Sequence, residues 1–146
     1  MTAGDPQKAF SIVIGNAIAE MPKIVDLVEA FGAHHSLPQQ TINALNICLD
    51  ELINNTISYG YDDSDKHDIA VELGFINGVL TAQVRDDGRP FDPRGAAPAL
   101  TDGDAQSRPI GGLGLHFVKT LMDEIKYSRI GATNLVTIEK RIQVNQ

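Results

Sequence analysis

The sequence predicts an α+β fold, a two-layer sandwich in which a mixed, mostly antiparallel sheet carries its helices on one face. Two pairs of apolar segments, each joined by a short turn, favour antiparallel strands, and a helical pattern separates the pairs. One more strand and two helical patterns precede them, so the expected order is β-α-α-β-β-loop-α-β-β. A chain of 146 residues can bury a real core, and we expect a single domain over residues 1–146.

The chain begins with an expected strand at residues 9–14, which are mostly apolar. The first helix is expected to start near Pro22, because proline is well tolerated in the first helical turn. Apolar residues recur at helical spacing as far as Phe31. The glycine and polar residues of segment 32–37 are expected to end this helix.

A second helix is expected over residues 38–59, with Gly60 as its stop signal. Its apolar positions cover one broad face, and Glu51, Asn55 and Ser58 lie one turn apart on the opposite side. Such a polar stripe is usually the solvated face of a helix. Asparagine is a mediocre helix former, however, so a carboxylate and a carboxamide one turn apart could instead serve a ligand.

The middle of the chain predicts a hairpin followed by a long irregular segment. Strands are expected at residues 68–76 and 79–85, around the turn Asn77-Gly78. Asp86 continues the inward-facing row of the second strand, as either a turn-capping residue or a carboxylate that recognises an N–H group of a ligand. The segment from about residue 93 to 109 has no clear period and is interpreted as a lid that orders over a ligand.

The last third of the chain starts with the glycine cluster at residues 111–115, which leads into a helix expected over residues 113–124. Glycines at a helix N-terminus can cradle a phosphate, because the first N–H groups have no partner within the helix. Many glycine clusters are plain turns, and this one fits neither a Walker A loop nor a Rossmann fingerprint. Two final strands are expected at residues 125–130 and 134–142, with a turn at 131–134 between them.

Composition narrows the class of function. The formal net charge is −7 and no run of Lys and Arg occurs, which argues against direct binding of nucleic acid or of an anionic membrane. Cys48 is the single cysteine, so we expect a packed thiol and no intrachain disulfide. No secretory signal and no run of about 18 apolar residues is evident, and we expect a cytoplasmic protein.

Three separated motifs resemble, in the right order, the ATP-binding boxes of the GHKL ATPase superfamily, which includes gyrase, heat-shock chaperone, histidine kinase and mismatch-repair families. Residues 51–55 (Glu-Leu-Ile-Asn-Asn) resemble its N box, Asp86-Asp87-Gly88 its first glycine box, and Gly112-Leu113-Gly114-Leu115 its second. Over about residues 8–142 the chain is similar to the small bacterial anti-sigma-factor serine kinases, through residues 49–55, 59–61, 90–93, 111–115 and 122–124.

The resemblance implies the histidine-kinase-like (Bergerat) ATP-binding fold and a role for each matching residue. Glu51 matches the general base, and Asn55 matches the ligand of Mg²⁺. Asp86 matches the carboxylate that accepts from the adenine amine, and Gly88 lets the base lie close. The remaining nucleotide-binding positions are Arg108 at the end of the lid, Gly112, Leu113, Gly114 and Leu115 of the second glycine box, and Thr133 as a support of adenine.

The function implied by the resemblance is that of an ATP-binding anti-sigma regulatory protein, a kinase that phosphorylates a serine or threonine on an anti-sigma antagonist of the STAS type. ATP and Mg²⁺ are the implied cofactors, and a homodimer and a sigma factor are further implied partners. The alternatives are a non-catalytic module whose grip on a partner depends on ATP, an ATPase of chaperone or topoisomerase type, and a domain without a ligand. The presence of Glu51 favours the kinase.

Overall fold

The computed structural model of the chain describes residues 10–95 and 112–143. Most of the expected lid lies outside the described residues, together with Arg108 and Gly111. The elements follow the expected order, with two short 3-10 helices in addition. They are β1 (Ser11–Gly15), η2 (Ile18–Glu20), α1 (Met21–His34), α2 (Gln39–Tyr59), β2 (Asp68–Ile76), β3 (Val79–Asp86), η3 (Pro93–Gly95), α3 (Gly112–Leu121), β4 (Glu124–Ile130) and β5 (Thr133–Arg141).

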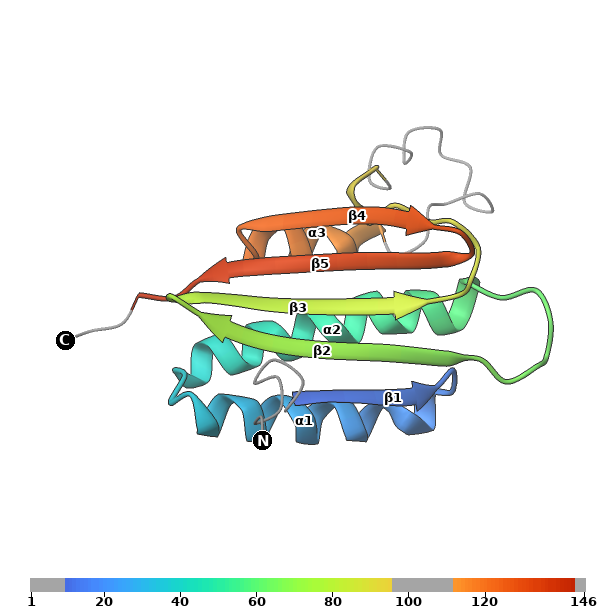
Figure 1. Cartoon of the computed structure of the whole chain (residues 1–146). Helices are drawn as coiled ribbons and strands as arrows, with labels where there is room; N and C mark the ends of the chain where they lie inside the picture. Colours follow the sequence, from blue (N-terminus) through green and yellow to red (C-terminus); the bar gives the residue numbers. More distant parts are fainter. Residues whose placement is uncertain (1–9, 96–111, 144–146) are drawn as a thin grey trace.

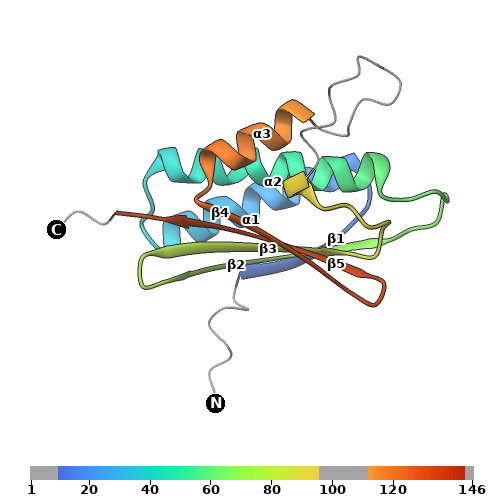
Figure 2. The ribbon, with the colours of Figure 1, turned by 90° about the horizontal axis from the view of Figure 1, so that it is seen from above.

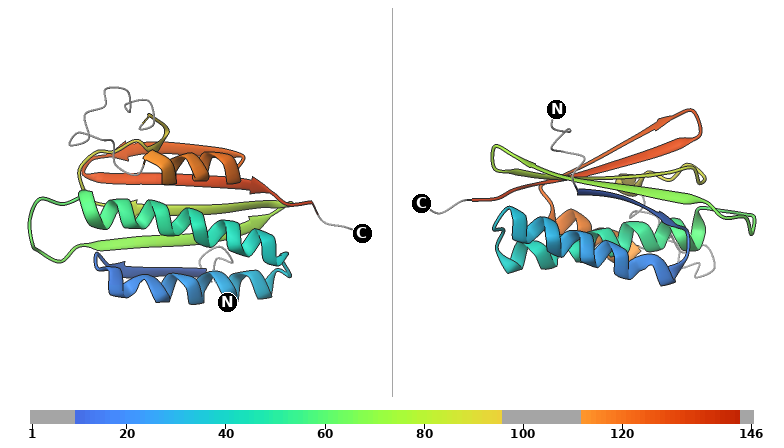
Figure 3. Two further views of the ribbon diagram at one scale, coloured as in Figure 1. Left: turned by 180° about the vertical axis from the view of Figure 1, so that it is seen from behind. Right: turned by 60° about the horizontal axis from the view of Figure 1, so that its bottom comes forward.

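The strands form one sheet in the order β1-β2-β3-β5-β4, and each pair of neighbours in it is antiparallel (Figure 1). The expected mixed sheet is therefore antiparallel throughout its described strands. The helices α1, α2 and α3 lie on one face of this sheet (Figure 2), and the view from behind shows them side by side across it (Figure 3). The predicted two-layer α+β fold is confirmed. None of the described helices is both long and apolar enough to span a membrane.

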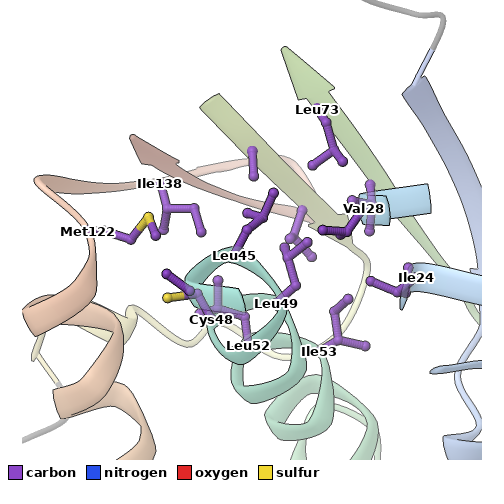
Figure 4. Close-up of a cluster of buried hydrophobic side chains, with 14 of the residues drawn as sticks. Ile24, Val28, Leu45, Cys48, Leu49, Leu52, Ile53, Leu73, Met122 and Ile138 are labelled. Atoms are coloured by element: carbon purple, nitrogen blue, oxygen red, sulfur yellow. The ribbon is translucent and has the colours of Figure 1, made fainter. Parts of the chain in front are cut away.

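The hydrophobic core fills the space between the sheet and the helices (Figure 4). Leu80, Ala82 and Val84 alternate along β3 with more exposed residues, as the period of two predicts. The apolar face of α2 includes Cys48, which is fully buried. Burial raises the pKa of the Cys48 thiol to about 12, so the expectation of a packed thiol is confirmed.

The first helix ends later than expected because Gly32 belongs to it. Gly32 is buried inside α1, where an added Cβ would lie 2.4 Å from Cδ1 of Ile42 on α2. The glycine therefore permits close packing of α1 on α2 and does not stop the helix. The helix ends where the Leu37 N–H bonds the Gly32 carbonyl at 2.9 Å and Ser36 has a φ of 54°.

The last helix ends at Leu121, whereas the sequence pattern predicted an end at Glu124. Lys140 Nζ donates to the Leu121 carbonyl at 2.9 Å, and the Asp123 N–H then donates to the Glu139 carbonyl of β5 at 2.8 Å. These contacts end α3 at Leu121 and place the following residues beside β5, where β4 begins. The apolar period misled the prediction because Ile125 packs against the same core from a strand.

Candidate functional site

A cavity opens between the C-terminal half of α2, the adjoining ends of β3 and β5, and α3. Its walls are largely apolar and include Leu52, Val84, Phe91, Leu115 and Val136. Three buried polar side chains also line it, namely Asn55, Asp86 and Asn134. An apolar cavity with a few converging polar groups is the usual form of a small-molecule site.

Glu51 and Asn55 form a hydrogen-bonded pair on α2, beside this cavity. Asn55 Nδ2 donates to the Glu51 carboxylate at 2.7 Å and to the Glu51 carbonyl at 2.9 Å. Both partners are acceptors, so the nitrogen of the amide must face Glu51 and the oxygen Oδ1 must face away from it. The interpretation of this polar stripe as a solvated helix face is wrong for Asn55, which is only 8% exposed, although Ser58 is exposed.

Asp86 lies at the end of β3, where it continues the inward-facing row as expected. Its Oδ1 accepts from the Gly88 N–H at 2.8 Å and from Asn134 Nδ2 at 2.9 Å. Asp86 therefore does cap a turn. Within the described residues both of these bonds use Oδ1, which leaves acceptor capacity on Oδ2.

Gly88 is the point at which α2 meets the first glycine box. An added Cβ at Gly88 would lie 2.7 Å from the Gly60 carbonyl oxygen and 3.1 Å from Asp86 Oδ1. The next residue, Arg89, donates its N–H to the same Gly60 carbonyl at 2.8 Å. A side chain at position 88 would therefore separate the two segments that carry Asn55 and Asp86.

The second glycine box opens α3, whose first residue is Gly112. Leu113 and Gly114 lie in its first turn, and Leu115 is buried and lines the cavity. The first turn of α3, where the N–H groups of a helix lack intrahelical partners, is therefore near the cavity. Arg108 lies outside the described residues, so its position relative to these groups is not described.

Thr133 and Asn134 take opposite sides of the sheet at the start of β5. Thr133 pairs with Ile130 across the turn and lines a second, more open depression, which shares only Asp86 with the main cavity. Asn134 lines the main cavity and is directly opposite Asp86 in the β3–β5 pairing. Sequence reasoning missed Asn134, although its alternation with the apolar residues Val136 and Ile138 could have placed it on the inward face.

A second polar group contacts Asp87, the residue after Asp86, and was also missed. The His67 ring stacks on the Tyr61 ring at 4.1 Å and bonds the carboxylates of Asp63 at 2.8 Å and Asp87 at 3.2 Å. These bonds, that to Asp63 above all, raise the pKa of His67. Burial, with smaller effects of the Asp86 and Asp87 carboxylates, raises the pKa of Tyr61. The group ties the loop after α2 to the residue that follows Asp86.

The family described as "Histidine kinase-like ATPase domain" matches residues 15–140. A serine-protein kinase RsbW of Listeria monocytogenes is 32% identical over 114 residues, which cover 73% of this chain and 73% of that protein. A serine-protein kinase RsbW of Bacillus velezensis is 32% identical over 101 residues, covering 66% of this chain and 63% of that protein.

A solved structure shares the fold. The crystal structure of the RsbU and RsbW domains of Rv1364c from Mycobacterium tuberculosis superposes with a TM-score of 0.63 at 17% sequence identity. The superposition covers 90% of this chain and 32% of that longer chain. At this identity the likeness extends to the arrangement of helices and strands alone.

Proposed function

This chain belongs to the histidine kinase-like ATPase family, and we propose that it binds ATP with Mg²⁺ and transfers the γ-phosphoryl group to a serine of a partner protein. One observation carries the proposal. Asn55, Asp86 and Leu115, from three motifs far apart in the sequence, line one cavity, and Glu51 is bonded to the first of them. The names of the RsbW relatives, which are serine-protein kinases, support the same reaction.

The apolar residues of the cavity fit an adenine ring. Leu52, Val84 and Val136 offer apolar surface to the flat faces of a purine. Asp86 Oδ2 can accept from the exocyclic amine of adenine, since Oδ1 is already occupied. The absence of a side chain at Gly88 keeps the glycine box against the end of α2.

A second set of residues, Asn55 and the start of α3, fits the phosphates and a divalent cation. Asn55 turns its carboxamide oxygen away from Glu51, and such an oxygen is a suitable ligand for Mg²⁺. Gly112, Leu113 and Gly114 offer backbone N–H groups at the start of α3, where the helix dipole favours negative charge. We include Arg108 as a further phosphate contact on the basis of the family resemblance alone. Bound Mg²⁺ would supply neutralisation of the charge between the phosphates.

Glu51 is the proposed general base. Because Asn55 occupies Oε2, Oε1 is the oxygen available to take the proton of a serine hydroxyl. The serine oxygen then forms a bond to the γ-phosphorus, and the bond from that phosphorus to the β,γ-bridging oxygen breaks. The products are a phosphoserine, ADP and a protonated Glu51. General-base help of this kind is worth about 10²–10⁴-fold in rate.

The proposed partner is an anti-sigma antagonist protein of the STAS type, with a sigma factor as a second partner. We also propose that the chain acts as a homodimer in the cytoplasm and that residues 1–146 form one functional domain. Thr133 lies outside the main cavity, and we assign the support of adenine to Asn134 in its place.

The proposal is tested with purified full-length protein in two steps. Titration calorimetry should detect binding of ATP in the presence of Mg²⁺. Incubation with labelled ATP and with proteins that co-purify from the native host should then yield one partner labelled on serine.

The outcomes separate the candidate functions. No heat with ATP and Mg²⁺ would overturn the whole proposal. Binding of ATP without labelling of any partner would indicate a non-catalytic module that binds its partner in an ATP-dependent manner. Steady hydrolysis of ATP without an acceptor protein would favour an ATPase.

A further inference from the structure

We propose that Asn134 is a positioning residue that sets the preference of this site for adenine over 6-oxo purines. It would do so by holding the carboxylate of Asp86 in one orientation. The inference rests on the proposed function, because it concerns how the same cavity distinguishes one purine from another.

Asn134 is the centre of a buried network. The residue is 3% exposed, and its Nδ2 donates to Asp86 Oδ1 at 2.9 Å and to the Arg89 carbonyl at 2.9 Å. Its Oδ1 accepts from the Tyr127 hydroxyl at 2.6 Å and from Arg129 Nη1 at 3.0 Å. Strong donors and acceptors therefore saturate both ends of this one amide.

The chemistry of the partners settles which way the amide points. A guanidinium can only donate, so the atom that meets Arg129 must be the amide oxygen. A carbonyl can only accept, so the atom that meets Arg89 must be the amide nitrogen. Asn134 is thus a fixed donor to Asp86, and it cannot turn over without losing bonds on both sides.

The fixed donor determines which oxygen of Asp86 is left for a ligand. Oδ1 already accepts two N–H groups, from Gly88 and Asn134, so a partial rotation of the carboxylate would weaken both bonds. Oδ2 is then an acceptor in a set position. An amine at purine position 6 donates to it, whereas an oxo group at that position brings two acceptors together. Polar sites of this kind discriminate strongly, because the wrong ligand leaves a buried group unpaired.

Arg129 and Tyr127 hold Asn134 from the edge of the sheet. Both lie on β4, next to β5, and Arg129 Nη1 also donates to the Gly88 carbonyl at 2.8 Å. The network therefore spans from β4 through Asn134 to the turn that contains Gly88. Neither residue is among those that line the cavity, so both act through Asn134 and the backbone.

The test compares ATP with inosine triphosphate, which differs in carrying an oxo group at position 6. Dissociation constants of both nucleotides with Mg²⁺ are measured by calorimetry for the wild-type chain and for Asn134→Leu, which keeps the size of the side chain but neither donates nor accepts. The affinity for ATP should fall by about tenfold or more, while that for inosine triphosphate changes by less. Thr137→Val, on the same strand but the opposite face, should leave both affinities unchanged.

Kinetics and a second variant distinguish a positioning role of Asn134 from a simple loss of folding. If partner phosphorylation is measured, Asn134→Leu should raise the KM for ATP and leave kcat at saturation close to the wild-type value. In Asn134→Asp, Arg129 and Tyr127 can still donate to the new carboxylate, which now lies beside Asp86. Two such carboxylates repel each other, so the affinity for ATP should fall in this variant as well.

Failure of this inference is distinguishable from failure of the proposed function. A wild-type chain that binds neither nucleotide would overturn both. Wild-type binding of ATP with no preference over inosine triphosphate would overturn the inference alone. The same follows if folded Asn134→Leu keeps the wild-type preference, or if folded Asn134→Asp keeps the wild-type affinity for ATP.

Discussion

The side-chain amide of Asn55 donates a 2.7 Å hydrogen bond to the carboxylate of Glu51, one helical turn earlier. A second bond from the same nitrogen, to the Glu51 carbonyl, fixes the direction of the amide. The proposed base and the proposed metal ligand are therefore set by one contact. A substitution at Glu51 tests the proposed base alone only if the new side chain still accepts the hydrogen bond from Asn55.

Glu51→Gln should stop phosphoryl transfer and spare nucleotide binding. Glutamine keeps an oxygen for the Asn55 amide but cannot take up a proton at neutral pH, so transfer should fall by about 10²–10⁴-fold. Labelled phosphate on the partner measures the transfer, and calorimetry with ATP and Mg²⁺ measures the binding. Asp50→Asn, at the exposed neighbouring carboxylate, is the matched control and should lose neither. Parallel loss of binding and transfer in Glu51→Gln would contradict a role as base.

Asn55→Ala should weaken ATP binding only when Mg²⁺ is present. The variant removes the oxygen proposed to hold the cation, and we expect about a tenfold loss of affinity with Mg²⁺ and little change in EDTA. Asn54→Ala is a close control, since Asn54 makes the same pair of bonds to Asp50, at 2.8 and 3.0 Å, on the exposed side. Equal losses with Mg²⁺ and with EDTA would exclude Asn55 as the ligand.

Gly32→Ala should destabilise the fold through overpacking of α1 against α2. The new methyl group would meet the Ile42 side chain at 2.4 Å, and overpacking of this kind costs about 1–3 kcal/mol. Urea denaturation measures the change. Gly74→Ala is the control, because an added Cβ there has no neighbour within 4 Å among the described residues. In the double variant with Ile42→Ala the costs should be less than additive, and strict additivity would refute the contact.

Cys48 should resist alkylation in the native protein. Its thiol is fully buried and its pKa is raised to about 12, so almost no thiolate exists at pH 8. Mass spectrometry after iodoacetamide treatment should show an unmodified chain without denaturant and one adduct in guanidinium chloride. The chain has a single cysteine, so the mass shift reports this site alone. Rapid labelling of the native protein would show that the thiol is accessible.

The stability of the protein should fall as His67 loses its proton. The Asp63 and Asp87 carboxylates raise the folded-state pKa of His67 above the ordinary histidine value of 6.5. The stabilisation is thus fully present below 6.5 and is lost as the pH rises through the folded-state pKa. Urea midpoints at pH 6 and pH 8 measure this loss, which should shrink in His67→Asn.

The substitution His67→Asn leaves the backbone contacts of this position in place. The His67 N–H and carbonyl bond Asn16 at 3.0 Å each, and these contacts survive a change of side chain. Nuclear magnetic resonance titration should also show that Asp63→Asn lowers the pKa of His67, whereas Asp65→Asn, at an exposed aspartate of the same loop, does not. A His67 pKa at or below 6.5 in the wild type would contradict the prediction.

Local patterns were sufficient for most of the fold. Periods of 3.6 and 2 identified the helices and strands, and the turn Asn77-Gly78, where both residues have positive φ, sets the β2–β3 hairpin. The predictions were wrong where a distant partner decides the outcome. Gly32 was predicted to end the first helix, because the sequence does not show that Ile42 packs against it. The apolar period through Ile125 predicted a longer last helix, because it does not show that Asp123 bonds β5.

The sequence by itself determined the two-layer fold, the order of its elements and the three motifs that carry Glu51, Asp86 and the glycines. Only the tertiary structure decided that Asn55 is buried, and that Asn134 rather than its neighbour Thr133 meets Asp86. The reason is the pairing of β3 with β5, strands that no short turn connects. A shift of that register by one residue would reverse which side chains face the cavity, and only the packed core selects between the two.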